Sequence, residues 1–540
     1  MKKILSAILA ICMLLTGASA FAAVEVNMEY PLVDEKVTMS MALLRGTVAG
    51  DPDEMWFWPY FEKLSNVHWE LDEIDNTVWW DKKTIMLASG DYPDVFWGPD
   101  FTTTEIMTYG SEGIFIPLND LIKEYMPNLT KLLDTYDAWG AITAPDGNIY
   151  SLPYFNISDY SGMRAWINKN WLDNLGIEKP TTLDEFYDML VAFKEQDANG
   201  NGDPDDEIPW GGTYLENIAG RSVVLSALGF INNEGSTAAV KDGVACYLPL
   251  HEDYRKYLEF ANKCWEAGLM DPDIFTQTAT QFKAKAMEMV VGYCSAGTPH
   301  DFVGYEEEAW SQYTHVIPLT SEVNETRIWY KPEVVGIGTM MVTDLCETPE
   351  VALRWMDMLY DPDWAVLFHN GPILGTDSDP DGIGWDPATG TTEPRGLTQA
   401  NPTELGWWDY LCEYMVPRGR GGMWYATIDD YYALDNATIF EYNRILSGEE
   451  GYWREENAAN AGEYFTSGYP NVVFYTEEES QTIKELLTPL TDYVAMMEAK
   501  FITGAESFDN YDSFVEELKK LGAEQIDEIY RTNYESYLAR

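Results

Sequence analysis

Residues 87–98 read LASGDYPDVFWG, and this stretch decides how the fold is interpreted. An apolar-sided helix ending runs through a Gly-Asp-Tyr-Pro-Asp turn into a short apolar run that ends in Trp97. Pro93 stiffens the backbone ahead of that run, so residues 94–97 are predicted to form a buried strand. The stretch is therefore interpreted as a helix returning to its sheet, with Trp97 emerging at the carboxyl end of the strand.

The segments before this stretch alternate in the same way. Residues 36–41 (KVTMSM) and 67–71 (VHWEL) alternate like strands, whereas residues 54–66 and 81–89 are helical in pattern. Strands and helices that alternate with short connections imply a parallel sheet covered by helices on both faces.

The character of the chain changes after Tyr154. Helical patterns dominate until strand-like apolar runs return at residues 290–293 and 334–342. We therefore expect an α/β protein with two discontinuous lobes around a hinge and a cleft, the second lobe being more helical. The predicted boundaries give 23–155 with 290–345 to the first lobe, and 156–289 with 346–540 to the second.

Residues 1–22 have the pattern of an export signal. Two lysines precede an apolar run that is too short to span a membrane, and small residues follow it. Leu15-Thr16-Gly17-Ala18 resembles a lipoprotein box in which Ala18 replaces the lipidated Cys. We expect secretion without a lipid anchor.

The chain is strongly acidic. Its 34 Lys and Arg against 90 Asp and Glu give a formal net charge of −56. Such a charge repels nucleic acid and anionic membranes. A solvated acidic surface is the first interpretation, and a specific cationic partner is the alternative.

Residues 197–208 (DANGNGDPDDEI) form the sharpest local motif. Side-chain oxygens recur at alternate positions and Gly202 permits a sharp turn, which is a pattern suited to Ca²⁺. The twelfth position is Ile208, where an EF-hand has Glu, and a metal-free polar turn is the alternative. The oxygens available to a structural Ca²⁺ belong to Asp197, Asn199, Asn201, Asp203, Asp205, Asp206 and Glu207.

Aromatic residues make up 14% of the chain. Most are expected to pack in the core, yet a sugar-binding cleft also uses flat aromatic faces ringed by carboxylates and amides. The sequence has no nucleophile elbow, no HExxH motif and no Walker loop. Carboxylates are too numerous for a glycosidase pair to be selected without geometry.

Several stretches together resemble the family 1 extracellular solute-binding proteins of bacterial ABC importers. They include IMLASGDYPDVFW, GIFIPLNDLIKEYMPNL, DGNIYSLPY, AWINKNWLDNLGI, PTTLDEFYDMLVAFKEQDANGNG and KFITGAESFDNYDSFVEELKKLG. The stretches keep the family order and extend over nearly the whole chain, and the resemblance is strongest to the LipO-like and alginate-oligosaccharide-binding branch.

The resemblance implies a periplasmic-binding-protein-like fold of type II, with no enzymatic activity. It implies that a monomer captures an oligosaccharide between its lobes and passes it to the permease subunits of an ABC importer at the cell surface. It also implies a structural Ca²⁺ at Asp197, Asn199, Asn201 and the Asp203 carbonyl. The DPDDEI segment is one residue longer than the family spacing, which leaves open whether Asp205, Asp206 or Glu207 completes the shell.

Ligand contacts are predicted at seven positions, and for each Trp packing is the alternative. Ligands of open α/β sheets bind beyond the carboxyl ends of strands, which supports the first two of these positions. The predicted contacts are Trp97, Asp100, Tyr154, Arg164, Trp210, Trp329 and Trp424.

Three alternatives stay open. A secreted glycoside hydrolase would release products from its oligosaccharide, and a surface adhesin or sensor would bind glycans without passing them on. A peptide ligand also remains compatible with the sequence.

Overall fold

The computed structural model describes most of the chain outside its first 23 residues and the region around 380–460. The described residues are 24–45, 50–98, 101–155, 165–203, 205–214, 220–233, 235–296, 299–304, 306–331, 333–361, 364, 367–368, 371–373, 376–378, 411–417, 462–470 and 472–539.

The first lobe is built on a five-stranded sheet in the order β2-β1-β3-β12-β4. The strands β1, β2 and β3 are parallel, and β12 runs antiparallel to both β3 and β4. The bounds are β1 Val37–Arg45, β2 Val67–Asp75, β3 Val95–Trp97, β4 Leu152–Phe155 and β12 Val335–Val342.

The opening stretch forms the turn that the sequence predicts. Gly90 ends the preceding helix in the left-handed conformation, with φ of 75°, where glycine carries no steric penalty. The Asp94 carboxylate then accepts hydrogen bonds from the backbone N–H and the hydroxyl of Ser40, at 2.7 and 2.8 Å. Asp94 thereby ties the start of β3 to its neighbour β1.

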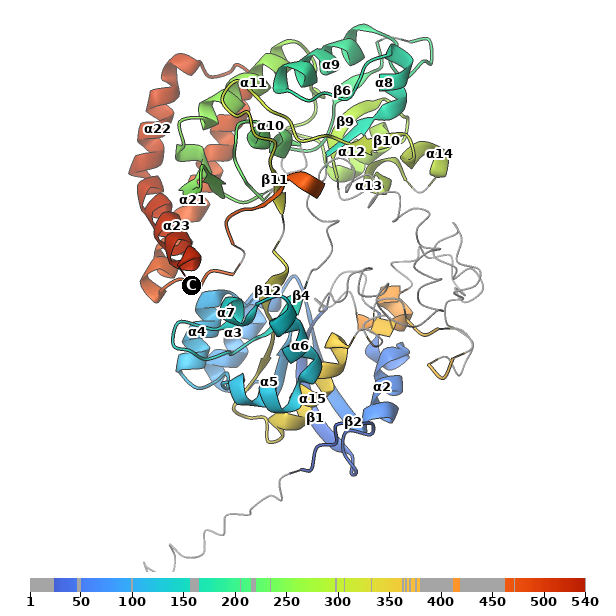
Figure 1. Ribbon diagram of the computed structural model, residues 1–540, viewed down its shortest axis with the longest axis vertical. Coiled ribbons are helices and arrows are strands. Elements are labelled where there is room, and N and C mark those ends of the chain that lie inside the picture. The colour runs from blue at the N-terminus through green and yellow to red at the C-terminus, as the bar shows by residue number, and fades with distance from the viewer. Residues whose placement is uncertain are drawn as a thin grey trace, which may run out of the picture.

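Helices cover both faces of this sheet (Figure 1). Apolar side chains of α2, α5, α6 and α15 pack with one face, and those of α3 and α4 with the other. The bounds are η1 Pro52–Glu54, α2 Phe57–Ser65, α3 Trp79–Ser89, α4 Thr103–Ser111, α5 Asn119–Tyr125, α6 Pro127–Thr135, α7 Trp139–Ile142, α15 Pro349–Asp357, η4 Met358–Tyr360 and η6 Leu411–Met415.

The second lobe contains a four-stranded sheet in the order β10-β5-β9-β6 and two small two-stranded sheets, β7-β8 and β11-β13. The bounds are β5 Ala165–Asn168, β6 Ile208–Trp210, β7 Ala238–Lys241, β8 Val244–Tyr247, β9 Val291–Ser295, β10 Tyr313–His315, β11 Trp329–Lys331 and β13 Phe465–Ser467.

Helices make up most of the second lobe, and the C-terminal helices α21, α22 and α23 lie together along one side of it (Figure 1). The bounds are α8 Lys169–Leu175, α9 Leu183–Glu195, α10 Arg221–Ala227, η3 Leu248–Leu250, α11 Tyr254–Glu266, α12 Ala279–Ala286, α13 His300–Val303, α14 Glu307–Trp310, η8 Gly462–Tyr464, α21 Glu477–Ile502, η9 Phe508–Asn510, α22 Tyr511–Lys520 and α23 Ala523–Leu538.

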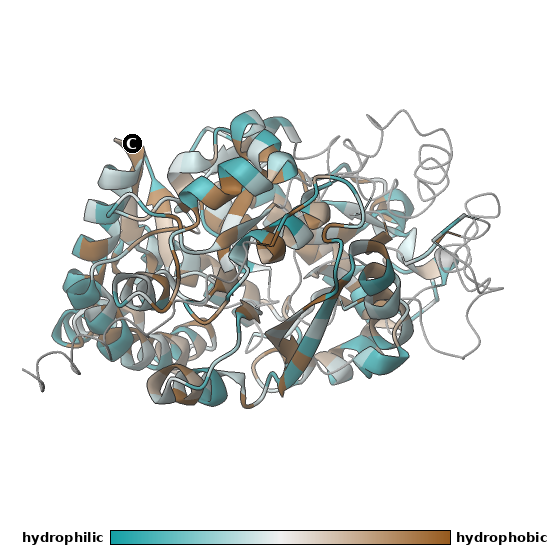
Figure 2. Ribbon diagram, turned by 90° about the horizontal axis from the view of Figure 1, so that it is seen from below, coloured by the Kyte–Doolittle hydropathy of each residue, from teal (hydrophilic) through white to brown (hydrophobic). Residues whose placement is uncertain are grey.

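Each lobe buries its own apolar clusters. The ribbon in Figure 2 is coloured by hydropathy, and hydrophilic and hydrophobic residues alternate along its helices. This is the pattern of helices that bury one face in a core. None of the helices in the described part of the chain combines the length and apolarity needed to span a membrane.

The two-lobed α/β architecture confirms the predicted fold class. The strand pairings, however, differ from the predicted lobe boundaries. β9 pairs with β5 and β6 of the second lobe, and α15 packs into the core of the first lobe. The apolar runs at 290–293 and 334–342 look alike in sequence, and strand pairing assigns them to different sheets.

Candidate functional site

One edge of the first sheet faces the second lobe. The parallel strands β1, β2 and β3 end there, at Arg45, Asp75 and Trp97. β12 runs the opposite way and begins at this edge with Val335, directly after the chain arrives from β11 of the second lobe (Figure 1). We call this edge the facing edge of the first lobe. In open α/β sheets ligands bind beyond the carboxyl ends of strands, so this edge is the candidate site.

The second lobe turns a comparable edge toward the first. β6 and β9 are parallel and end there, at Trp210 and Ser295, while β5 begins there at Ala165. The chain leaves β6 through the buried residues Gly211 and Gly212.

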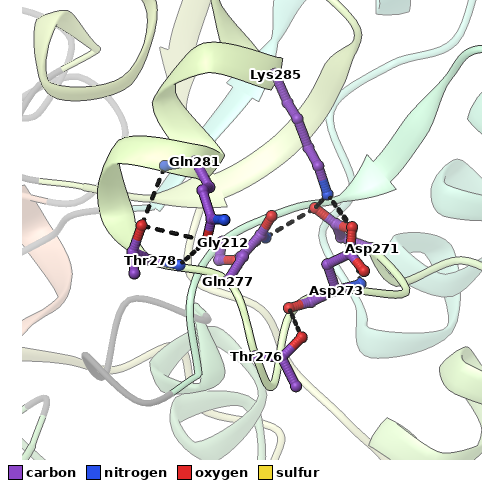
Figure 3. Close-up of polar contacts among 8 residues, drawn as sticks. All are labelled: Gly212, Asp271, Asp273, Thr276, Gln277, Thr278, Gln281 and Lys285. Atoms are coloured by element: carbon purple, nitrogen blue, oxygen red, sulfur yellow. Dashed lines mark hydrogen bonds and ion pairs between the residues drawn. The ribbon is translucent and has the colours of Figure 1, made fainter.

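A buried polar network holds this exit from β6 (Figure 3). The Gln277 amide donates to the Gly212 carbonyl at 2.6 Å and to Oδ2 of Asp271 at 2.8 Å. Asp271 is fully buried and pairs with the Lys285 ammonium at 3.0 Å. Lys285 neutralises the buried Asp271 carboxylate, and Gln277 links that carboxylate to the Gly212 backbone. This network fixes the path of the segment after β6.

The segments between the lobes are tied to both of them. Val472 and Phe474, which precede α21, pack into the core of the first lobe. Thr104 of α4 forms a hydroxyl–hydroxyl hydrogen bond with Ser480 of α21. Near the C-terminus Tyr537 donates to Oε1 of Glu333, just before β12, at 3.3 Å.

Three of the predicted ligand contacts are buried inside the lobes. Trp97 is 0% exposed and packs between Phe368 and two other Trp rings. Trp210, 1% exposed, lies against Phe186 and Tyr293, and Trp329 is 3% exposed. Burial supports the packing role that the sequence left open for each Trp.

Tyr154 differs from these residues because its ring is only half-buried and lies near the facing edge. Gly336 is its partner on β12, and a Cβ added there would stand 2.1 Å from the Tyr154 ring. A glycine is therefore needed for the ring to lie across the neighbouring strand. The remaining predicted contacts, Asp100, Arg164 and Trp424, lie outside the described residues.

Trp80, which is 49% exposed, is not among the ligand contacts predicted from the sequence. It follows the carboxyl end of β2 by five residues, in the first turn of α3. The sequence does place Trp80 shortly after the end of a predicted strand, where ligand contacts are expected. It does not show which of the two adjacent Trp residues is buried. The structure buries Trp79 and leaves Trp80 at the surface.

The loop 197–207 folds back on itself through its own side chains. Asn199 Oδ1 accepts from the N–H of Asn201 at 2.9 Å, and Asn201 Oδ1 accepts from the N–H of Asp203 at 2.7 Å. Both Asn amide nitrogens donate to Asp206, at 3.0 and 2.6 Å. Asp205 is exposed and its N–H donates to Asp203 Oδ1 at 3.3 Å.

Two carboxylate oxygens of this loop have no hydrogen-bond partner among the described residues. Oδ1 of Asp197 and Oε2 of Glu207 are buried without a hydrogen bond in the described structure. Glu207 is 3% exposed, and this burial raises its pKa above the usual value. Its other oxygen accepts from the N–H of Ala198 at 2.9 Å. Buried carboxylate oxygens without donors are what a hard cation would satisfy.

The residues of the loop thus fit a calcium ion. Its carboxylates alone would not make up the whole coordination shell. Among the described residues no group of three or more His, Cys, Asp and Glu side chains is arranged to hold a metal. The loop would need its Asn amide and backbone carbonyl oxygens to complete a shell of six to eight.

Comparison with known proteins identifies the family. The family model for bacterial extracellular solute-binding proteins matches residues 47–366. The chain belongs to this family. This membership confirms the resemblance inferred from the sequence, and the family consists of binding proteins rather than enzymes.

A curated relative matches almost the whole length of this chain. It is the fructooligosaccharide ABC transporter substrate-binding protein FusA of Streptococcus pneumoniae serotype 4, which is 26% identical over 528 residues, 94% of this chain and 92% of FusA.

Solved structures share the fold. The structure of S. pneumoniae FusA in complex with kestose superposes on this chain with a TM-score of 0.69 at 24% identity. The match covers 93% of this chain and 99% of the FusA chain. An EF-hand mutant of FusA in complex with fructo-nystose gives a TM-score of 0.71 at 24% identity, with the same coverage.

Proposed function

We propose that this solute-binding protein captures an oligosaccharide between its two lobes and delivers it to the permease subunits of an ABC importer. The match to FusA over 94% of the chain is the observation that carries the proposal. The two lobes, whose facing edges are joined by several crossings, suit capture by closure (Figure 1). Ligand would then shift an equilibrium between open and closed states.

Isothermal titration calorimetry tests this function directly. The purified protein is titrated with kestose and nystose, with other neutral oligosaccharides, and with a panel of short peptides. Saturable heat with at least one oligosaccharide is expected. Binding of peptides alone, or of no member of either panel, would contradict the proposal.

A second measurement separates binding from hydrolysis. The protein is incubated with the bound oligosaccharide for a day, and the sugar is then recovered and sized by chromatography. A binding protein returns the sugar intact. Release of shorter products would favour the glycoside hydrolase alternative.

We also propose that the loop 197–207 holds a structural Ca²⁺. Asp197 and Glu207 would contribute carboxylate oxygens, because each has one buried oxygen that no described residue hydrogen-bonds. Asn199, Asn201 and the Asp203 carbonyl would supply neutral oxygens. The EF-hand mutant among the FusA structures is the comparison that supports such a loop in a relative.

For localisation we propose export through residues 1–22 and function at the outer cell surface. The extracellular character of the family supports this. Among the predicted ligand contacts, Tyr154 is proposed as a direct contact because it is partly exposed near the facing edge. Asp100, Arg164 and Trp424, which lie outside the described residues, are proposed as further ligand contacts.

A further inference from the structure

A half-exposed Trp stands at the facing edge of the first lobe. Trp80 occupies the first turn of α3, immediately after the turn that follows β2. Val78 and Trp80 are each 49% exposed, whereas Trp79 between them is 1% exposed. The buried Trp79 anchors the helix in the core, so the chain presents its neighbour outward at a fixed point.

A buried ammonium group supports one face of the Trp80 ring. The Lys83 nitrogen lies 4.2 Å from the centre of the Trp80 ring and 4.3 Å from that of Phe101. The Lys83 side chain is 1% exposed and pairs with Glu105 at 3.0 Å. Glu105 in turn closes the capping box of α4 with Thr102. The ring of Trp80 thus rests on a cation held by a second helix.

This arrangement leaves an oriented aromatic surface. One face of the indole is used by the cation–π contact, and the ring nevertheless stays half exposed. A side chain that is already ordered loses little conformational entropy when a ligand covers it. Exposed polar groups, among them Asp75 and Asn76, precede it at the same edge.

We propose that Trp80 is a stacking surface for one ring of the captured oligosaccharide and that the sugar is uncharged. The proposal deepens the proposed function and rests on it. A flat aromatic face matches the C–H face of a pyranose or furanose ring. The chain carries a net charge of −56, and the Lys83 ammonium beneath the ring is neutralised by Glu105. A uronic acid would therefore meet repulsion at this edge, which a neutral sugar avoids.

Calorimetry on three variants tests the assignment. Each protein is titrated with kestose, nystose, maltotriose and trigalacturonate. The proteins compared are wild type, Trp80→Ala, Trp80→Phe and the control Ile85→Ala. Ile85 is 66% exposed on the same helix and is not part of the ring–cation stack. For the neutral sugar that wild type binds, Trp80→Ala is expected to raise Kd about tenfold or more. Trp80→Phe should recover part of the affinity, and Ile85→Ala should leave it unchanged.

The outcomes separate this proposal from the function on which it rests. Tight binding by wild type with Kd of Trp80→Ala within about twofold of it would overturn the stacking role and leave the function intact. Unchanged Kd with lost oligosaccharide uptake in cells would assign Trp80 to the permease contact instead. Preference of wild type for trigalacturonate would overturn the neutral-sugar assignment. Absence of binding to every sugar would refute the proposed function itself.

Discussion

The ring of Trp97 stacks on that of Phe368, with ring centroids 6.0 Å apart and an angle of 25° between the planes. Trp97 ends the strand of the opening stretch, whereas Phe368 follows α15 far along the chain. Their contact closes the core of the first lobe. It also explains why Trp97 is buried at a strand end where the sequence suggested a binding surface.

Replacing Trp97 with Ala is expected to lower the free energy of unfolding by about 3–5 kcal/mol, because a large buried ring leaves a cavity. Urea denaturation followed by circular dichroism measures the change. Trp80→Ala serves as the control and should stay within about 0.5–1 kcal/mol of wild type, since that ring is half exposed. An unchanged unfolding free energy together with weaker sugar binding would restore Trp97 as a ligand contact.

Calcium is expected to raise the melting temperature of chelated protein by binding the loop 197–207 in the folded state. Asp197→Ala and Glu207→Gln should each abolish the increase, because each removes a buried oxygen that has no hydrogen-bond partner in the described part of the chain. Asp173→Ala is the matched control, since Asp173 is an exposed carboxylate on α8 outside the loop. Differential scanning fluorimetry with and without Ca²⁺ gives the result. If Ca²⁺ left the melting temperature of wild type unchanged, the proposed calcium site would be wrong.

His315 is expected to make the protein sensitive to acid. The residue is 1% exposed, and neither ring nitrogen has a hydrogen-bond partner among the described residues. Burial, with a smaller effect of the Lys179 ammonium, lowers the pKa of His315 from 6.5 to about 3. The folded state therefore binds fewer protons than the unfolded state between these values. The resulting stability is present above pH 6.5 and is lost as the pH falls toward 3.

The His315 prediction is measured by comparing unfolding free energies at pH 7 and pH 5. Over this interval the residue should cost wild type about 2 kcal/mol, and His315→Phe should be less acid-sensitive by that amount. His68→Gln is the control, because His68 is a partly exposed histidine paired with Glu62. Equal acid sensitivity of wild type and His315→Phe would show that the unfolded and folded states protonate His315 alike.

Gln277→Leu should destabilise the second lobe by about 1–3 kcal/mol. The substitution removes the amide that joins the Gly212 carbonyl to Asp271 and leaves both acceptors buried. Thr276→Ala, at an exposed neighbouring position, should have little effect on the same denaturation curve. A loss no larger than that of Thr276→Ala would show that water replaces the amide.

Much of the fold was predictable from local pattern. The alternation of short strands and helices before residue 98 follows from apolar periodicity, and the turn at 90–94 follows from Gly and Pro chemistry. Residues 36–41, 67–71, 81–89 and 94–97 all lie in or at the ends of the elements expected of them. The family resemblance was equally legible, since its motifs keep their order along the chain.

The sequence by itself determined the fold class and the family, because apolar periodicity and motifs that keep their order along the chain carry both. It also supplied the motif at 197–208 on which the calcium proposal rests. Tertiary structure alone decided which strand joins which sheet and which Trp is buried. β9 and β12 are similar apolar runs, and only pairing separates them. Trp79 and Trp80 are identical neighbours in the sequence, and only their packing distinguishes them. Trp79 is buried against Phe101, whereas Trp80 rests on Lys83 and stays half exposed. Burial depends on partners distant in sequence, which local periodicity does not encode.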